Sequence, residues 1–406
     1  MLLRHLIKYN SKIGSHVKVK RYKLSEYDKN VIMLVGMADS PHFIKWLRTM
    51  YQEFPDRKII IFPSDRPRFK YNSILSLKKN RRRNLICFRL VPFKQLNFVL
   101  YFVLDNLIGI RWRAYFLARL IILYKPGIIH FHEMQHGAYI FNYISTYKNI
   151  SSNSRKIIST WGSDLTLYSW DSEHINQIKA SLAWADIVTA ERKEEYVDAQ
   201  RLGFEGDFRA PLYITIGQNR AQVIKQVLPS SRSIILVKGH QSDTGRALNA
   251  LQAICHLGSQ LKDFEIIVYS APNSVKIQVD TLRNKNKINI KTIPKISHEN
   301  MCDLFYRARV SISLAVSDGL PGVLVEAMQA GALPIQSANS AGKDFIVHGE
   351  NGFLVEPWDI GLIQECIISS ISNNALVDHA SKLNAEILQE KYSLNAGVRK
   401  LRELYL

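Results

Sequence analysis

Short apolar runs alternate with amphipathic stretches along most of the chain. In the first half these runs are Val31–Gly36, Lys58–Phe62, Ile86–Val91, Gly127–His132, Lys156–Thr160 and Asp186–Ala190. After a less regular segment near Pro211–Ser233 the rhythm restarts with Ser233–Lys238, Glu265–Ser270, Val310–Val316 and Leu333–Ser337. Strands that are apolar throughout and separated by helices are typical of parallel sheets covered on both faces. The pattern predicts an α/β fold with two doubly wound parallel-sheet domains facing a cleft.

The length of the chain agrees with two domains. It has 406 residues, of which 47% are hydrophobic, enough for two cores. We place an N-terminal domain at residues 1–212 and a C-terminal domain at residues 213–385. Residues 386–406 are expected to form a helix that packs back on the N-terminal domain.

The positive charge of the chain is concentrated in its first third. Residues 1–125 hold 26 Lys and Arg against 7 Asp and Glu, whereas residues 126–406 hold 28 of each sign. This asymmetry indicates a polyanionic neighbour: nucleic acid, an anionic membrane leaflet or an anionic acceptor. A merely solvated basic surface is the alternative.

Residues 93–124 are rich in apolar and aromatic side chains. Their longest uncharged run, Gln95–Leu104, is ten residues, about half of what a membrane span needs. The segment is therefore expected to be either a pair of core helices or a surface helix lying on lipid. The nearby basic run at residues 78–83 suits anionic head groups.

The most specific stretch is Ser317–Gly331, with the sequence SDGLPGVLVEAMQAG. It follows an apolar strand, turns through small residues and enters a helix that carries Glu326. A strand, a tight turn and a helix N-terminus together form an anion site built from backbone N–H groups. Two carboxylates in this setting, Asp318 and Glu326, can accept paired hydrogen bonds from sugar hydroxyls.

This stretch resembles the acidic E-x7-E motif of glycosyltransferase family 4, the retaining GT-B nucleotide-sugar enzymes also called glycosyl transferases group 1. The similarity extends to Glu326-Ala327-Met328, to the small residues 330–334, and to Ile346–Pro357 and Ser159–Asp164. In this chain Asp318 stands where the family usually has the first Glu. The resemblance implies a GT-B fold and a nucleotide-sugar donor.

The resemblance also implies roles for single residues. Asp318 would meet the transferred sugar, and Glu326 would hold the ribose hydroxyls. The remaining donor-binding residues would be Gly319, Leu320, Pro321, Gly322 and Ser270.

Family members usually present a Lys and an Arg to the donor diphosphate, because negative charge builds on this leaving group as the glycosidic bond breaks. Lys238 and Arg246, in the first strand–helix connection of the C-terminal domain, occupy that location in reverse order. The alternative is a solvated surface pair.

Loops of the N-terminal domain supply candidates for the acceptor side of the cleft. They follow predicted strands, whose carboxyl ends meet at one edge of a parallel sheet. These candidates are His42, His132, Glu133, Trp161 and Asp164.

A rival motif is His132-Glu133-Met134-Gln135-His136, a literal H-E-x-x-H. On a helix this spacing binds zinc, and the alternative function is therefore a zinc metallopeptidase. Against it, the motif begins at a strand end, Gly137 follows it, and no Glu, Asp or His lies between His136 and Arg155. A basic nucleic-acid-binding protein is the third class, but no recognition module for it is legible.

The sequence therefore predicts a retaining hexosyltransferase or N-acetylhexosaminyltransferase that uses a UDP- or GDP-sugar, without a required metal or other cofactor. A glycan or lipid-linked acceptor in bacterial cell-envelope polysaccharide synthesis fits the basic first third by analogy. Four well-separated cysteines favour a reducing compartment. We expect a cytoplasmic protein, peripheral on the inner face of the cell membrane, with no nucleic-acid partner. The sugar, the nucleotide, the acceptor and the oligomeric state stay open.

Overall fold

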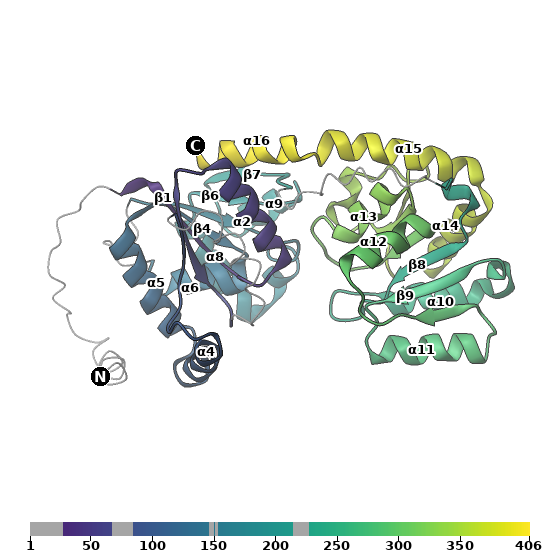
Figure 1. Cartoon of the computed structure of the whole chain (residues 1–406), viewed down its shortest axis with the longest axis horizontal. Coiled ribbons are helices and arrows are strands. Elements are labelled where there is room, and N and C mark those ends of the chain that lie inside the picture. The colour runs from purple at the N-terminus through teal and green to yellow at the C-terminus, as the bar shows by residue number, and fades with distance from the viewer. Residues whose placement is uncertain (1–26, 67–83, 146–149, 151–152, 214–226) are drawn as a thin grey trace.

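Two parallel sheets organise the chain (Figure 1). The computed structural model describes residues 27–66, 84–145, 150, 153–213 and 227–406. The N-terminal sheet has seven strands in the order β3-β2-β1-β4-β5-β6-β7, and the C-terminal sheet has six in the order β10-β9-β8-β11-β12-β13. All neighbouring strands pair in parallel, as predicted for two doubly wound domains.

The N-terminal sheet is buried on both faces because its central strands contain continuous apolar runs, such as Val31–Val35 and Ile59–Phe62. In β1, Met33 and Val35 pack with one core cluster while Ile32 and Leu34 pack with the other. The strands are β1 (Asp28–Gly36), β2 (Lys58–Pro63), β3 (Leu85–Cys87), β4 (Pro126–His132), β5 (Arg155–Ser159), β6 (Ile187–Thr189) and β7 (Asp207–Arg209). The α-helices are α2 (Pro41–Glu53), α4 (Lys94–Ile108), α5 (Arg111–Tyr124), α6 (Tyr139–Asn142), α8 (Ser172–Trp184) and α9 (Glu195–Arg201).

The C-terminal domain repeats this architecture. Its strands are β8 (Ile234–Lys238), β9 (Glu265–Tyr269), β10 (Ile290–Thr292), β11 (Ala308–Ser313), β12 (Leu333–Ser337) and β13 (Phe353–Val355). Its helices are α10 (Ala247–Leu257), α11 (Asn273–Asn284), α12 (His298–Arg307), α13 (Gly322–Ala330), α14 (Ile360–Ser372) and α15 (Asn374–Lys391). The main core lies between the sheet and α10, α11 and α14.

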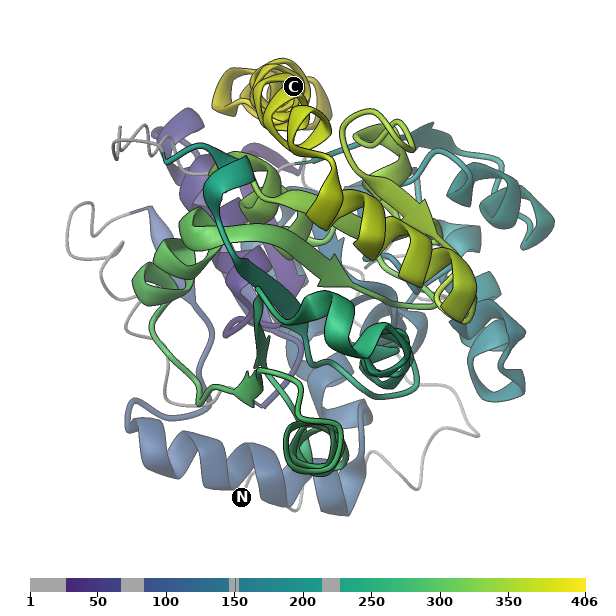
Figure 2. The same cartoon turned by 90° about the vertical axis from the view of Figure 1, so that its right-hand side faces the viewer.

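The last helix, α16 (Leu394–Tyr405), leaves the C-terminal domain and packs on α2 (Figure 1). Trp46 Nε1 donates to the Tyr405 hydroxyl over 3.1 Å, and Arg402 pairs with Glu53 at 2.6 Å. Figure 1 shows α15 and α16 along the top edge of the molecule, and Figure 2 shows them nearly end-on. The boundary that we placed at residues 385–386 falls inside α15, and the segment that contacts the N-terminal domain is α16.

The strand predicted at Ile86–Val91 is wrong in extent, because β3 ends at Cys87. The backbone N–H groups of Leu90 and Val91 donate to Asn97 Oδ1, at 2.9 and 3.4 Å, in the first turns of α4. The chain therefore leaves the sheet early to begin this helix.

Residues 93–124 form two helices with different environments. In α5, Leu117 and Ile121 are buried in the core of the N-terminal domain. In contrast, α4 carries a row of exposed apolar side chains. Among the described residues no single helix is long and apolar enough to span a bilayer; α14 taken together with Asn374–Tyr405, bent by 94°, meets that test by length and composition.

Candidate active site

The loop between β11 and α13 lies at the carboxyl edge of the C-terminal sheet. Its course is fixed by backbone bonds, from Asp318 N–H to Asn339 O over 3.2 Å and from Ala341 N–H to Gly319 O over 3.0 Å. Pro321 precedes the first helical residue, Gly322, so the helix N-terminus opens directly beside this loop. We call residues 317–322 the donor loop.

Asp318 lies near basic side chains from both domains. Burial raises the pKa of its carboxyl, and the charges of Lys238, His42 and His240, with the Gly319 N–H, oppose that rise. Lys238 ends β8, and His42 is in the first turn of α2. The structure thus brings Asp318, Lys238 and His42 together across the domain boundary.

Arg246 has a different environment. Its Nη1 donates to the carbonyl oxygens of Ser242, Asp243 and Gly245, at 2.9, 3.2 and 2.8 Å. The guanidinium therefore holds the loop between β8 and α10.

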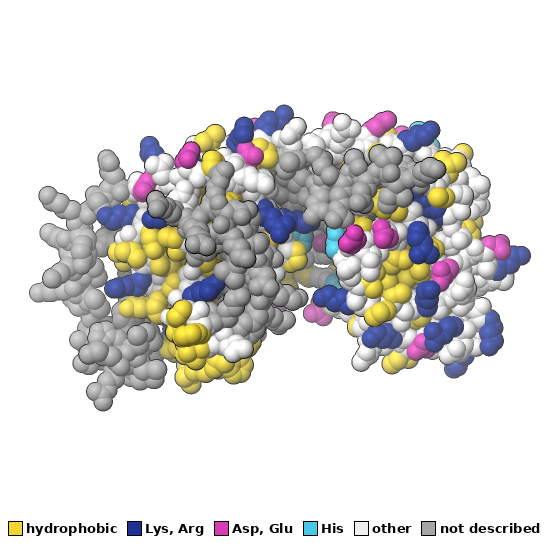
Figure 3. Space-filling model, in the orientation of Figure 1, with side chains coloured by type: hydrophobic (Ala, Val, Ile, Leu, Met, Phe, Trp, Pro, Cys, Tyr) yellow, Lys and Arg dark blue, Asp and Glu magenta, His cyan; other side chains and the backbone are white. Residues whose placement is uncertain are grey.

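Glu326 lies on α13 and bonds to a residue that the sequence analysis did not single out. Its Oε1 is 2.9 Å from Nε2 of His298, at the start of α12. Both side chains line a hollow with Gly322 and with Lys45 of α2, so residues from both domains border it. In Figure 3, acidic and histidine side chains gather where the two halves of the molecule meet.

Ser270 directly follows β9 in a left-handed backbone conformation, with φ of 55°. Its side chain is exposed, whereas the preceding Tyr269 is buried near Glu326, whose charge adds to the effect of burial in raising the pKa of the phenol. The turn at Ser270 leads the chain from β9 toward α11.

On the N-terminal side, Asp164 ties two strand-end loops together. Its Oδ2 accepts from the N–H groups of Met134 and Trp161, at 3.1 and 3.0 Å. Burial raises the pKa of its carboxyl to about 6, although these bonds oppose the rise. The Trp161 ring, held in this way, lies 5.7 Å from the His42 ring. Asp164 thus positions an aromatic side chain at the cleft.

Glu133 occupies a strained turn directly after β4, with φ of 71°. Burial, together with the nearby Asp164 and Asp65, raises the pKa of its carboxyl to about 9. Its Oε1 is buried without a hydrogen-bond partner. The side chain is thus a neutral carboxylic acid at pH 7.

The H-E-x-x-H residues do not share one helical face. His132 belongs to β4, whereas His136 belongs to the π-helix Met134–Ala138. The His132 ring is fully buried, 4.8 Å from Trp46 and 5.0 Å from Phe43, and burial lowers its pKa to about 3. This arrangement differs from the helical zinc site on which the peptidase interpretation depends.

The donor loop touches the N-terminal domain directly. Its Leu320 N–H donates to Glu191 Oε2 over 2.7 Å, and the Ser317 hydroxyl lies 3.2 Å from that of Ser163. A Cβ on Gly162 would lie 2.3 Å from Gly319 N, so no larger residue fits there without a shift. Burial raises the pKa of Glu191 to about 7. The negative charge of Asp318 adds to this rise, whereas the hydrogen bond from Leu320 opposes it.

Residues 219–387 match the family described as glycosyl transferases group 1. The C-terminal domain is a glycosyl transferases group 1 domain. No curated protein sequence matches the chain.

Solved glycosyltransferase structures share the two-domain GT-B fold of this chain. HepE from Anabaena in complex with UDP-glucose superposes with a TM-score of 0.66 at 11% identity, over 92% of this chain and 98% of that one. Sucrose-phosphate synthase from Thermosynechococcus elongatus gives 0.66 at 16% identity, over 92% and 98%. TarM gives 0.68 at 13% identity, over 95% and 100%.

The sequence analysis did not identify two residues of the candidate site: His298 in the C-terminal domain and Glu191 in the N-terminal domain. His298 follows Ser297, whose side chain caps α12 by accepting from Asn300 N–H over 3.2 Å, a local signal for a helix start at this position. Glu191 follows β6 with no motif around it. Only the contact between the two domains singles it out.

Proposed function

We propose that this glycosyltransferase is a retaining enzyme that moves a hexose or N-acetylhexosamine from a nucleotide diphosphate to a glycan or lipid-linked acceptor. The observation that carries the proposal is the convergence of Asp318, Lys238 and His42 at the junction of the two domains. A carboxylate for sugar hydroxyls and a cation for the departing diphosphate are the groups that such a transfer needs.

The proposed donor site has three parts. Asp318 accepts from the hydroxyls of the transferred sugar. Lys238 and the backbone N–H groups at the start of α13 stabilise the diphosphate as it leaves, and Arg246 is the second proposed diphosphate ligand. Glu326, 2.9 Å from His298, accepts from the ribose hydroxyls, and Ser270 is a further proposed donor contact.

The proposed acceptor side lies at the carboxyl edge of the N-terminal sheet. His42 and Trp161 border the cleft, while Asp164 and the buried His132 hold the loops that present them. Glu133, as a neutral acid, is able to donate a hydrogen bond to an acceptor oxygen. The acceptor we propose is a growing bacterial cell-envelope glycan at the inner face of an anionic membrane, in keeping with the basic first third of the chain.

A panel of nucleotide sugars tests the proposal. HepE was crystallised with UDP-glucose, and UDP-sugars are therefore the first donors to compare with GDP-sugars. A true donor should raise the Tm of the protein by mass action. The anomeric configuration of the product, read by NMR, should equal that of the donor. An inverted product would overturn the retaining mechanism, and the absence of any stabilising nucleotide sugar would overturn the donor site.

A further inference from the structure

Helix α4 turns its apolar side away from the protein. Side chains along one stripe of the helix are 40–71% exposed, and the residue before its first turn is 70% exposed. We call this stripe the α4 apolar face: Phe93, Leu96, Val99, Phe102, Val103 and Leu107. In Figure 3 it forms the yellow surface over the position of α4 in Figure 1. Large exposed apolar patches mark interaction sites on soluble proteins.

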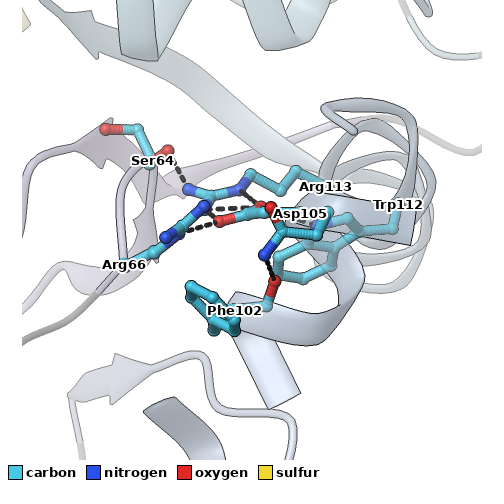
Figure 4. Close-up of polar contacts among 7 residues, drawn as sticks. Ser64, Arg66, Phe102, Asp105, Trp112 and Arg113 are labelled. Carbon is cyan, nitrogen blue, oxygen red and sulfur yellow. Dashed lines mark hydrogen bonds and ion pairs between the residues drawn. The ribbon is translucent and has the colours of Figure 1, made fainter. Parts of the chain in front are cut away.

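The opposite side of α4 is fastened to the domain by polar groups (Figure 4). Asp105 accepts from Arg66 and Arg113, both at 2.7 Å, and from Trp112 Nε1 at 2.9 Å. Arg113 also donates to the carbonyl oxygen of Ser64.

Packing and hydrogen bonds support this ion-pair network. Tyr101 is fully buried against Trp112, at a ring distance of 4.7 Å, and Asn97 is 4% exposed. The helix is therefore oriented with its ionic and amide groups inward, and folding of this chain does not account for its apolar outer face.

The charges around this face are positive. The sequence from Lys94 to Tyr124 contains one acid, Asp105, which is neutralised by its arginine partners. The Arg66 guanidinium lies 4.9 Å above the Phe102 ring. On α5, which packs beside α4, Arg111 and Arg119 are exposed. An apolar surface flanked by these arginines complements an anionic lipid leaflet.

A second copy of this chain is a poor occupant. Two-fold pairing through the α4 apolar face would bring two copies of the same arginine-bordered surface together, and the chain carries a net charge of +19. Like charges at an interface oppose association, whereas lipid phosphates attract the same side chains.

We propose that the α4 apolar face inserts into the boundary between head groups and acyl chains of an anionic membrane. The proposal rests on the proposed function, because a lipid-linked acceptor would be presented at that surface. The cation–π contact of Arg66 holds its charge beside Phe102, and long arginine side chains reach head groups while their stems stay in the apolar zone.

The test is vesicle co-sedimentation of the full chain. The double variant Val99→Gln/Leu107→Gln alters two side chains of the face, 52% and 71% exposed. Ile277→Gln/Val197→Gln is the matched control, since each side chain is 67% exposed on α11 or α9. We expect the wild type and the control to bind phosphatidylglycerol-containing vesicles, with binding by the α4 variant weaker by on the order of tenfold or more. Pure phosphatidylcholine should bind the wild type weakly.

Other outcomes overturn the proposal. Equal vesicle binding by the α4 variant and the wild type would show that the α4 apolar face does not contact the lipid. A wild-type dimer in sedimentation velocity that the α4 variant abolishes would assign the face to a second copy instead. Stabilisation by nucleotide sugars, measured on the same preparations, separates the two hypotheses: its absence from every protein overturns the glycosyltransferase proposal, whatever the vesicles show.

Discussion

Glu326 lies on α13 and Asp318 lies in the loop that precedes this helix, and we propose different partners for them. Glu326 shares its hollow with His298 and is 28% exposed, so a ribose can reach it from the open side of the cleft. Asp318 lies deeper, among Lys238 and the histidines of both domains. Because the two carboxylates lie at different depths, we expect substitution of Glu326 to affect nucleotide binding and substitution of Asp318 to affect sugar transfer.

Glu326→Ala should weaken binding of the nucleotide diphosphate by about 1.5–3 kcal/mol, because hydrogen bonds from ribose to a charged acceptor are lost. Isothermal calorimetry measures this directly. Glu299→Ala, which alters the same hollow without touching the proposed ribose contact, is the control. Unchanged nucleotide affinity in the Glu326 variant would exclude that residue from the donor site.

Asp318→Ala should reduce kcat far more than it reduces nucleotide affinity, because its proposed partner is the sugar. Steady-state kinetics and calorimetry on the same protein compare the two losses. If nucleotide affinity falls as far as turnover, the assignment of Asp318 to the sugar is wrong.

Asp105 offers a prediction about pH. Burial favours its neutral form, but bonds from Arg66, Arg113 and Trp112 outweigh burial and lower the pKa of the carboxyl. A lowered pKa stabilises the folded state above the ordinary value for Asp, about 3.9, and this contribution is lost as the pH falls through the folded value.

Asp105→Asn should therefore lower the free energy of unfolding by on the order of 3 kcal/mol at pH 7. The difference from the wild type should shrink below pH ~3. Urea unfolding at both pH values measures it. Asp280→Asn removes an exposed pair with Arg283 and should cost about 1 kcal/mol or less at either pH. A constant difference for Asp105→Asn across pH would contradict the assignment.

At the scale of elements, the sequence is informative where hydrophobic residues are continuous. The strands β1, β2, β4, β8, β9, β11 and β12 are predictable because each lies in a short stretch rich in apolar residues, such as Val31–Val35 in β1 and Ile234–Val237 in β8. The strands β7, β10 and β13 have three residues each and went unpredicted. In β7, Asp207-Phe208-Arg209, polar ends hide the pattern, and only pairing with β6 makes it a strand.

The candidate site was predictable in part for a related reason. Asp318 and Glu326 lie within one local motif, so their spacing is visible in the sequence. The bond from His298 to Glu326 spans 28 residues and that from Leu320 to Glu191 spans 129. Such contacts depend on tertiary packing, which no local pattern encodes. The orientation of α4 was likewise left open, because its buried face is the polar one.

The positions of His132 and His136 at and after the end of β4 lead to a prediction about metal dependence. With His132 in a strand and His136 in a π-helix, we expect transfer activity to survive exhaustive chelation. Metal analysis of the purified protein should find no stoichiometric zinc. One zinc per chain that disappears in His132→Ala would revive the peptidase interpretation.

At the scale of the whole molecule, the net positive charge is concentrated in residues 1–125. Replacing Lys78, Lys79, Arg81, Arg82 and Arg83 by Gln should weaken binding to anionic vesicles, since each basic residue near a surface contributes about 1 kcal/mol. These residues lie outside the described part of the structure. Turnover on a short soluble acceptor should hardly change, because residues 126–406 are balanced in charge.

Salt should reproduce the effect of these substitutions in the wild type, since the attraction fades beyond a Debye length of about 10 Å at 0.1 M. Indifference of the protein to anionic vesicles at low salt would reassign the charge to an anionic acceptor glycan. In that case salt should raise the KM for the acceptor.

The hydrogen bond from the Leu320 N–H to Glu191 means that a side chain of the N-terminal domain competes with any ligand for this backbone N–H. A backbone amide donates to one strong acceptor at a time, and Glu191 already supplies a carboxylate oxygen at 2.7 Å. If the donor loop binds the nucleotide sugar as proposed, the incoming ligand has to displace a side chain whose effective concentration is set by the fold. The apparent donor affinity is then the intrinsic affinity reduced by the fraction of molecules in which this contact is open. A low measured affinity for the nucleotide-sugar donor is therefore compatible with a well-formed donor site.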